Sequence, residues 1–363
     1  MVRLGREMTE VLVDEYGPDE FIRRLADPVW FQSLGTVLAF DWNASGLTTI
    51  LTAALKEAIR GQEKDLGIFI CGGKGKTSRK TPDEIGWWGE RLSLPQNHIR
   101  SLVYNSKMSA KVDSSLIQDG YQIYHHSFFF SRNGSWAVVQ QGMNTQNATA
   151  RRYHWYSEKI KDLVCEPHSG IATQVRKKSM LNLTAKSSDK TRIVSTELAR
   201  AGYQRLRRDF EILRRHSSEF SRMIAIKSGQ EKLTLLEIAN VEFSHHPVEF
   251  EDFSQSKYLQ KILSRLGEHQ PKTYEELLAT DGVGPKTVRA LSLVSEVIYG
   301  AAPSYEDPAR YSFAHGGKDA TPYLVDRTTY DQTIEILGNA VRKSKINPVE
   351  KDKVLRRLQG RTL

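Results

Sequence analysis

The chain has 363 residues, of which 39% are hydrophobic and 26% charged, and its formal net charge is +9 with a pI near 9.3. This length favours two domains, because single hydrophobic cores stop growing near ~250–300 residues. No apolar run approaches the ~20 residues that span a bilayer, and Glu7, Glu10 and Asp14 interrupt any signal-peptide core. We therefore expect a cytoplasmic protein without a membrane segment. The two cysteines are far apart, which argues against a zinc cage, and the basic charge favours a polyanionic partner.

The first sixty residues predict three helices, since apolar side chains recur at helical spacing over Val2–Tyr16, Asp19–Leu25 and Leu47–Arg60. The loop at 40–46 contains Asp41 and Asn43. These two residues are interpreted as turn formers, with a place in an active site as the alternative.

A short apolar strand, Gly67–Cys71, leads into a basic, glycine-rich stretch that carries Lys74, Lys76 and Arg79. The spacing differs from the GxxxxGK[ST] pattern of a phosphate loop, so a nucleotide hydrolase is not indicated. The stretch is either a mobile loop that wraps a nucleic-acid phosphate or a merely solvated loop. A new helix is expected to begin at Thr81, with Thr81 as its cap and Pro82 at the first position.

Residues 110–143 carry the β signal. Asn133-Gly134 between the β-rich runs Gly120–Phe130 and Ser135–Gln141 predicts a hairpin. The first run cannot keep its apolar residues on one face unless a bulge lies near His125-His126.

Polar residues are numerous around this hairpin. Asp113, Asp119 and His125, with Lys111, could bind Mg²⁺ or Mn²⁺ and activate water, as in a nuclease. Their spacing matches no nuclease signature, and a polar core or one solvated face of the sheet is the alternative.

Basic and aromatic residues alternate in the stretch 151–156, which suits either backbone tracking and base stacking or the edge of a core. A polar break at Lys186–Lys190 is the expected domain boundary. Beyond it, Ala199–Ser228 holds eight Lys/Arg against three Asp/Glu. This segment, with Arg207 and Arg208, predicts a solvated helix that faces DNA.

The stretch Thr273–Tyr299 reads as helix, hairpin, helix. Gly282-Val283-Gly284 forms the turn, Pro285 begins the second helix, and Lys286 and Thr287 follow. The backbone amides of this turn lack helical partners and can bind a phosphate. The GVGPKT sequence resembles the helix-hairpin-helix DNA-binding motif, which implies contact with the DNA backbone.

Lys257–Leu337 as a whole resembles the core of the helix-hairpin-helix DNA glycosylase superfamily. The resemblance implies that Lys286 attacks the sugar C1′ and that Asp326, at the start of the helix Thr328–Leu337, assists it. The segment between the two residues is longer than is usual in that superfamily, because of the insertion SFAHGGKD. In many non-catalytic proteins the equivalent lysine only contacts phosphate, and Asp326 is also a natural helix cap.

Over its full length, from FDWNASGLTT to YSFAHGGKD, the chain resembles an uncharacterised, mainly archaeal and thermophilic family of unknown function, whose members often begin upstream of the position of Met1. The sequence predicts an α+β N-terminal domain, residues 1–185, with helices and a small antiparallel sheet, and an all-α helix-hairpin-helix domain, residues 190–363, with the motif at 273–299. The expected function is DNA repair or processing by a glycosylase/lyase that needs no cofactor. A Mg²⁺- or Mn²⁺-dependent nuclease and a non-catalytic nucleic-acid-binding adaptor are the alternatives, and the oligomeric state is left open.

Overall fold

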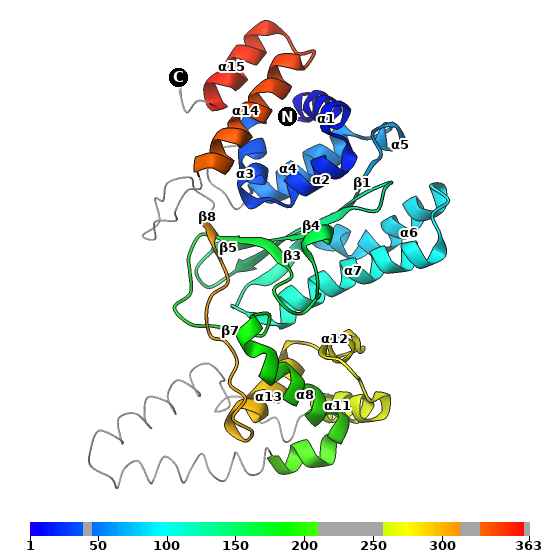
Figure 1. Ribbon diagram of the computed structural model, residues 1–363, viewed down its shortest axis with the longest axis vertical. Coiled ribbons are helices and arrows are strands. Elements are labelled where there is room, and N and C mark those ends of the chain that lie inside the picture. Colours follow the sequence, from blue (N-terminus) through cyan, green and yellow to red (C-terminus); the bar gives the residue numbers. More distant parts are fainter. Residues whose placement is uncertain (39–45, 210–256, 313–326, 359–363) are drawn as a thin grey trace, which may run out of the picture.

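A twisted sheet with helices on both faces organises the computed structural model, which describes residues 1–38, 46–209, 257–312 and 327–358 (Figure 1). Neighbouring strands pair antiparallel except β6 and β8, which are parallel. The predicted mixture of helices with a small, largely antiparallel sheet is therefore confirmed. In spatial order the described strands of this sheet are β1 (Ile68–Lys74), β3 (Gln122–Ser131), β4 (Trp136–Asn144), β5 (Thr149–Tyr156), β6 (His168–Thr173) and β8 (Tyr311–Ser312).

Helices from both ends of the chain cover one face of the sheet. Residues Ile70, Phe129 and Val139 of neighbouring strands point to this face and are buried in one apolar cluster with the N-terminal helices. Leu337 and Val341, from the C-terminal helices, complete the same cluster, so the two ends of the chain share one core. The helices are α1 (Val2–Tyr16), α2 (Pro18–Leu25), α3 (Pro28–Val37), α4 (Leu47–Ala58), α5 (Glu63–Leu66), α14 (Arg327–Lys343) and α15 (Pro348–Leu358).

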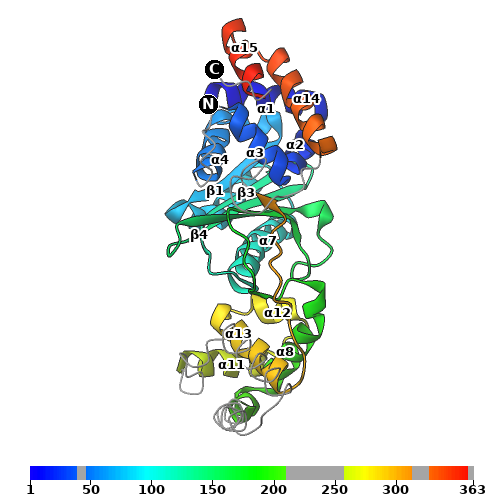
Figure 2. The ribbon, with the colours of Figure 1, turned by 90° about the vertical axis from the view of Figure 1, so that its left-hand side faces the viewer.

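The alternate residues Phe69, Phe128 and Val138 point to the opposite face, where α6 (Thr81–Arg91) and α7 (Gln96–Ser115) pack. The same apolar cluster includes residues of a further helical group. This group lies beyond α7 in both views (Figures 1 and 2). That group consists of α8 (Asp189–Ala201), α11 (Lys257–His269), α12 (Tyr274–Ala279) and α13 (Pro285–Val297). A small ladder of β2 (Ile117–Gln118) with β7 (Leu181–Asn182) lies between α7 and this group.

Several predicted elements agree with the structure. α1 has the expected bounds, and the expected helices at 19–25 and 47–60 correspond to α2 and α4. The Asn133-Gly134 turn joins β3 to β4, and the register of that pair shifts between Ile123 and His125, where the bulge was expected. Asp41 and Asn43 lie outside the described residues.

Other expectations need correction. α3 was not predicted, and α7 continues to Ser115, so residues 110–115 are helical rather than part of the β region. The basic stretch after Cys71 prolongs β1 to Lys74 and then forms a 3₁₀ turn, η1 (Gly75–Lys80). Lys80 holds the N-cap position of α6, which makes Thr81 its first residue rather than its cap.

The side chains of residues 151–156 are buried in the sheet. Because a buried side chain cannot follow a DNA backbone, the core interpretation of this stretch is correct and the base-stacking interpretation is wrong. Further short 3₁₀ turns are η2 (Ser157–Lys159) and η3 (Lys186–Ser188). Within the described ranges, no helix has the length and apolar character needed to cross a membrane.

Candidate functional site

The turn between α12 and α13 has the backbone that its glycines predict. Gly282 adopts φ +86°, a left-handed conformation that glycine reaches without strain. Gly284 is extended and holds the N-cap position of α13, with Pro285 in the first turn and no side-chain hydrogen bond to the cap. Gly284 itself has no side chain to cap the start of α13, and the N-terminus of a helix favours an anion.

Side chains from other elements fix the turn by binding its carbonyl oxygens. Tyr258 Oη donates to the carbonyl of Gly282 at 2.5 Å, and Arg265 donates to that of Asp281 at 2.9 Å. A Cβ on Gly282 would lie 2.3 Å from Cδ1 of Ile262, so the turn also packs tightly on α11. The turn is thus preorganised by contacts with a helix that lies earlier in the chain.

Two further side chains attach the turn to α7 and β2. Lys111 Nζ donates to the carbonyl of Thr280 at 2.8 Å, and Gln118 Nε2 donates to that of Pro285 at 3.0 Å. Arg289 Nε in turn donates to Gln118 Oε1 at 2.6 Å. These contacts join residues about 170 positions apart in the chain, so no local sequence pattern identifies them.

The residues predicted to bind DNA at the turn differ in exposure. Gly282 and Gly284 are half-buried and Lys286 is exposed. Val283 is 3% exposed and packs in the core, and Thr287 is buried, with no hydrogen-bond partner for its hydroxyl among the described residues. Only the backbone at these last two positions can reach a ligand.

The predicted nucleophile and its assistant are described only in part. Lys286 lies in the first turn of α13 with its side chain exposed, while Asp326 lies outside the described residues.

The alternative group on the sheet is divided among separate networks. Asp113 accepts hydrogen bonds from Trp155 and Gln140 and pairs with His168 at 2.5 Å. Asp119 pairs with Arg151 at 3.0 Å. His125 and Lys111 have other partners, Thr52 and the carbonyl of Thr280. Among the described residues, no group of three or more His, Cys, Asp or Glu side chains is placed to hold a metal ion.

Two buried polar clusters explain the many polar residues of the sheet, and they lie on opposite faces. His126, Gln140 and Tyr153 occupy paired positions on the α7 face. The neighbouring residues His125 and Arg152 occupy the face of the N-terminal helices. Neighbouring residues on a strand point in opposite directions, so adjacency in sequence separates these side chains in space.

Burial shifts the pKa values of several side chains in these clusters. It lowers the pKa of His125 to about 3, with His126 and Lys74 as minor causes, and lowers the pKa of Arg152 to about 9. Burial also raises the pKa of the Asp119 carboxyl, against the opposing charge of Arg151. His125 is therefore neutral at pH 7, as expected of a core histidine.

The remaining predicted DNA-binding residues are exposed but lie on different elements. Lys74, Lys76 and Arg79 belong to β1 and η1, and Lys74 is stacked 6.0 Å from the ring of Tyr124. Arg207 and Arg208 lie on a helical segment at 203–209, which meets the C-terminal end of α13 through a hydrogen bond between Tyr299 and Asp209. α13 has 13 residues, so these arginines lie about 20 Å along its axis from the turn.

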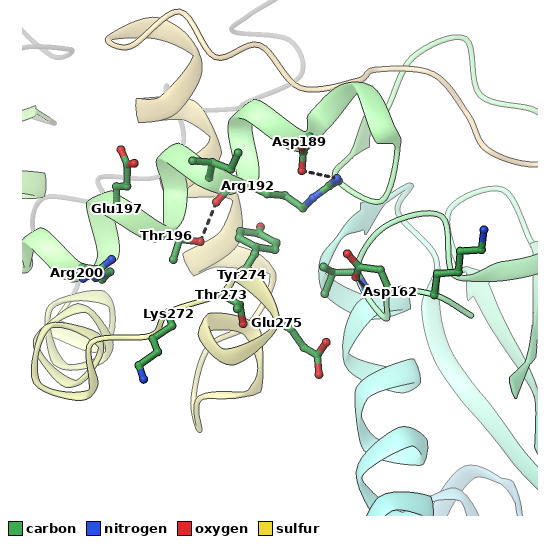
Figure 3. Close-up of a pocket in the computed structure, with 13 residues that line it drawn as sticks. Asp162, Asp189, Arg192, Thr196, Glu197, Arg200, Lys272, Thr273, Tyr274 and Glu275 are labelled. Carbon is green, nitrogen blue, oxygen red and sulfur yellow. Dashed lines mark hydrogen bonds and ion pairs between the residues drawn. The ribbon is translucent and has the colours of Figure 1, made fainter. Parts of the chain in front are cut away.

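A groove of about 500 Å³ lies between α8, the segment 161–164 and the start of α12 (Figure 3). The groove is lined by equal numbers of basic and acidic side chains. The buried guanidinium of Arg192 donates hydrogen bonds to the carbonyls of Leu183 and Ala185. A balanced lining does not favour a polyanion. Its charged residues are Lys161, Arg192, Arg200, Lys272, Asp162, Asp189, Glu197 and Glu275.

Comparison with known families gives one match: the family described as "Protein of unknown function (DUF763)" matches residues 1–325. No curated protein and no solved structure matches the chain.

Proposed function

Since the chain belongs to the DUF763 family, whose description names no activity, we propose its function from geometry and sequence: α12, the turn at 280–284 and α13 act as a helix-hairpin-helix that binds the phosphate backbone of DNA. The observation that carries this proposal is the N-terminus of α13, whose cap residue Gly284 offers no side-chain acceptor while its turn is fixed by Tyr258, Arg265 and Lys111. The +9 net charge of the chain supports a polyanionic ligand.

The substitution Gly284→Asp tests this site without removing the fold. Aspartate is a favourable N-cap residue, and its carboxylate would accept the amides of the first helical turn in place of a phosphate. We expect the variant to be as stable as the wild type or more so, and to lose at least tenfold in affinity for duplex DNA, measured by fluorescence anisotropy.

Gly284→Ala is the matched control, because a Cβ at this position meets no atom within 4 Å and the backbone is extended. This variant leaves the amides uncapped and is expected to bind DNA nearly as the wild type does. Equal affinities of the Asp and Ala variants would contradict phosphate binding at the turn.

For the chemistry, we propose a glycosylase or lyase reaction at the deoxyribose, with Lys286 as the nucleophile and Asp326 as its assistant. The resemblance to the glycosylase superfamily and the exposed position of Lys286 beside the turn support this proposal. The amine would add to the aldehyde carbon of an abasic sugar and expel water to form an iminium ion, which borohydride reduces to a stable secondary amine.

Lys286→Arg separates chemistry from binding, because arginine keeps the positive charge but does not form the iminium ion. With abasic DNA, borohydride and EDTA, we expect a covalent adduct with the wild type and none with Lys286→Arg, while affinity for DNA stays within about threefold. An adduct that persists in the variant would exclude Lys286, and strand cleavage that requires Mg²⁺ or Mn²⁺ would favour a nuclease instead.

A further inference from the structure

The solvent face of α7 has an unusual composition. Within this helix, which the structure describes in full, the only acidic residue is Asp113, and it is buried. The exposed positions include two cations, Arg100 and Lys107, and the hydroxyl groups of Ser101 and Ser114. Every one of these groups can donate a hydrogen bond to a phosphate oxygen.

The two cations are available to a ligand. The side chains of Arg100 and Lys107 make no hydrogen bond or ion pair within the described part of the chain, and both residues are exposed. They are seven residues apart, or about two turns, so they share one face and lie about 10 Å apart along the axis.

This face leads directly to the turn before α13. Tyr104 and Lys111 lie on the same side of α7 as the two cations, and both bind the α12 region: Tyr104 Oη donates to Glu275 at 2.7 Å, and Lys111 Nζ to the carbonyl of Thr280 at 2.8 Å. α12 thus runs alongside α7 and delivers the turn to the C-terminal end of that face (Figures 1 and 2). The nearby carboxylate of Glu275 is engaged by Tyr104.

We propose that the solvent face of α7, through Arg100 and Lys107, is a second phosphate-binding surface that continues the contact made by the turn along one strand of duplex DNA. The inference rests on the proposed function of the turn. From the level of Lys111 to Arg100 the helix covers eleven residues, or about 16 Å, and successive phosphates of one strand are 3.4 Å apart along the duplex axis. The surface therefore spans about five nucleotides beyond the turn.

The double variant Arg100→Ala/Lys107→Ala tests this surface. Each lost phosphate contact makes the dependence of log Kobs on log[salt] shallower by about 0.9, so the double variant should lose about 1.8 from that slope and bind more weakly regardless of DNA sequence. The measurement is fluorescence anisotropy with a labelled duplex over a salt series, with circular dichroism to confirm that both proteins are folded.

Lys64→Ala/Lys353→Ala is the matched control, since it removes the same charge from exposed lysines on α5 and α15, across the sheet from α7. The control should keep the wild-type slope. The two double variants could instead show the same salt slope, while the wild type binds duplex DNA and Gly284→Asp does not. That result would contradict the proposed α7 surface and leave the proposed function of the turn in place. If the wild type itself does not bind duplex DNA, both proposals fall.

Discussion

At the scale of single residues, hydrogen bonds determine the state of the buried polar cluster on the α7 face. Gln140 Nε2 donates to Asp113 Oδ2 and to the carbonyl of Ser109, which leaves Gln140 Oε1 to accept from His126 Nδ1 at 2.7 Å. His126 therefore carries its proton on Nδ1, and its Nε2 accepts from the Ser106 hydroxyl at 2.9 Å. The side chains of Asp113, Gln140, His126 and Ser106 are thus linked by hydrogen bonds, and such pairing is the condition under which a buried polar cluster is stable.

His125, on the opposite face, makes stability depend on pH. Burial lowers its pKa to about 3, below the ordinary value of 6.5, so between these values the unfolded chain binds a proton that the folded chain does not. The contribution of His125 to the unfolding free energy is fully present above pH 6.5 and is lost as the pH falls toward 3. His125→Gln should remove this contribution, so between pH 6 and 4 its unfolding free energy should fall less steeply than that of the wild type, by about 1.4 kcal/mol per pH unit.

Urea denaturation at several pH values measures this difference. His269→Gln, at an exposed histidine of α11, is the control and should give a curve parallel to that of the wild type. Parallel curves for wild type and His125→Gln would show that His125 titrates alike in the folded and unfolded states.

At the scale of elements, the sequence predicts those whose residues signal locally. α1 has a regular apolar stripe and the β3–β4 turn has Asn133-Gly134, so both were found. α7 was missed because its buried face mixes apolar residues with Ser106, Ser109 and Asp113, which hides the helical period. α3 was missed for the opposite reason: it is short and buried nearly all round, so no stripe is visible.

The same contrast holds for the candidate site. Glycine and proline signalled the turn before α13, whereas the side chains that fix it come from α7, β2 and α11 and carry no local signal. The structure does not bring the predicted group of Asp113, Asp119 and His125 together. Neighbouring residues of a strand point to opposite faces of the sheet, and Asp113 of α7 binds Gln140 on the face opposite to His125.

The fit between α11 and the turn gives a prediction at this scale. Gly282→Ala forces a left-handed conformation on a residue with a Cβ and places that Cβ 2.3 Å from Ile262 Cδ1, so we expect a loss of about 1–3 kcal/mol in unfolding free energy. Adding Ile262→Val removes the Cδ1 atom and should recover part of this loss, because the steric clash disappears while the backbone strain remains. A double-mutant cycle in urea measures the coupling. Strictly additive effects would show that the turn does not rest on Ile262.

At the scale of the whole molecule, the last described helices of the chain pack against its first helices. α14 and α15 pack on α1 and α3, and Lys343 pairs with Glu15 while Arg3 pairs with Glu350 at 2.9 Å. The turn before α13 lies on the other side of the sheet, beyond α7 (Figure 1). The sequence prediction assigned residues 190–363 to one helical domain, and its last described helices lie instead on the N-terminal layer. Such long-range packing depends on apolar faces that many partners could cover, so the sequence alone does not specify it.

This closure predicts that the C-terminal helices stabilise the molecule through the burial of their apolar residues. Leu337 of α14 is fully buried in the core shared with α1–α4, so Leu337→Ala leaves a cavity and should lower the unfolding free energy by about 2–5 kcal/mol. Val349 of α15 is 78% exposed, and Val349→Ala, the matched control, should change it by no more than about 0.5 kcal/mol. Urea denaturation followed by tryptophan fluorescence reports on both faces of the sheet, because Trp30 of α3 is buried in the shared core and Trp155 in the core on the α7 face. If Leu337→Ala shifts the midpoint of that fluorescence transition, the two ends of the chain unfold together. An unchanged midpoint would mean that α14 detaches before the sheet unfolds, and the N-terminal helices would then have to hold their core without it.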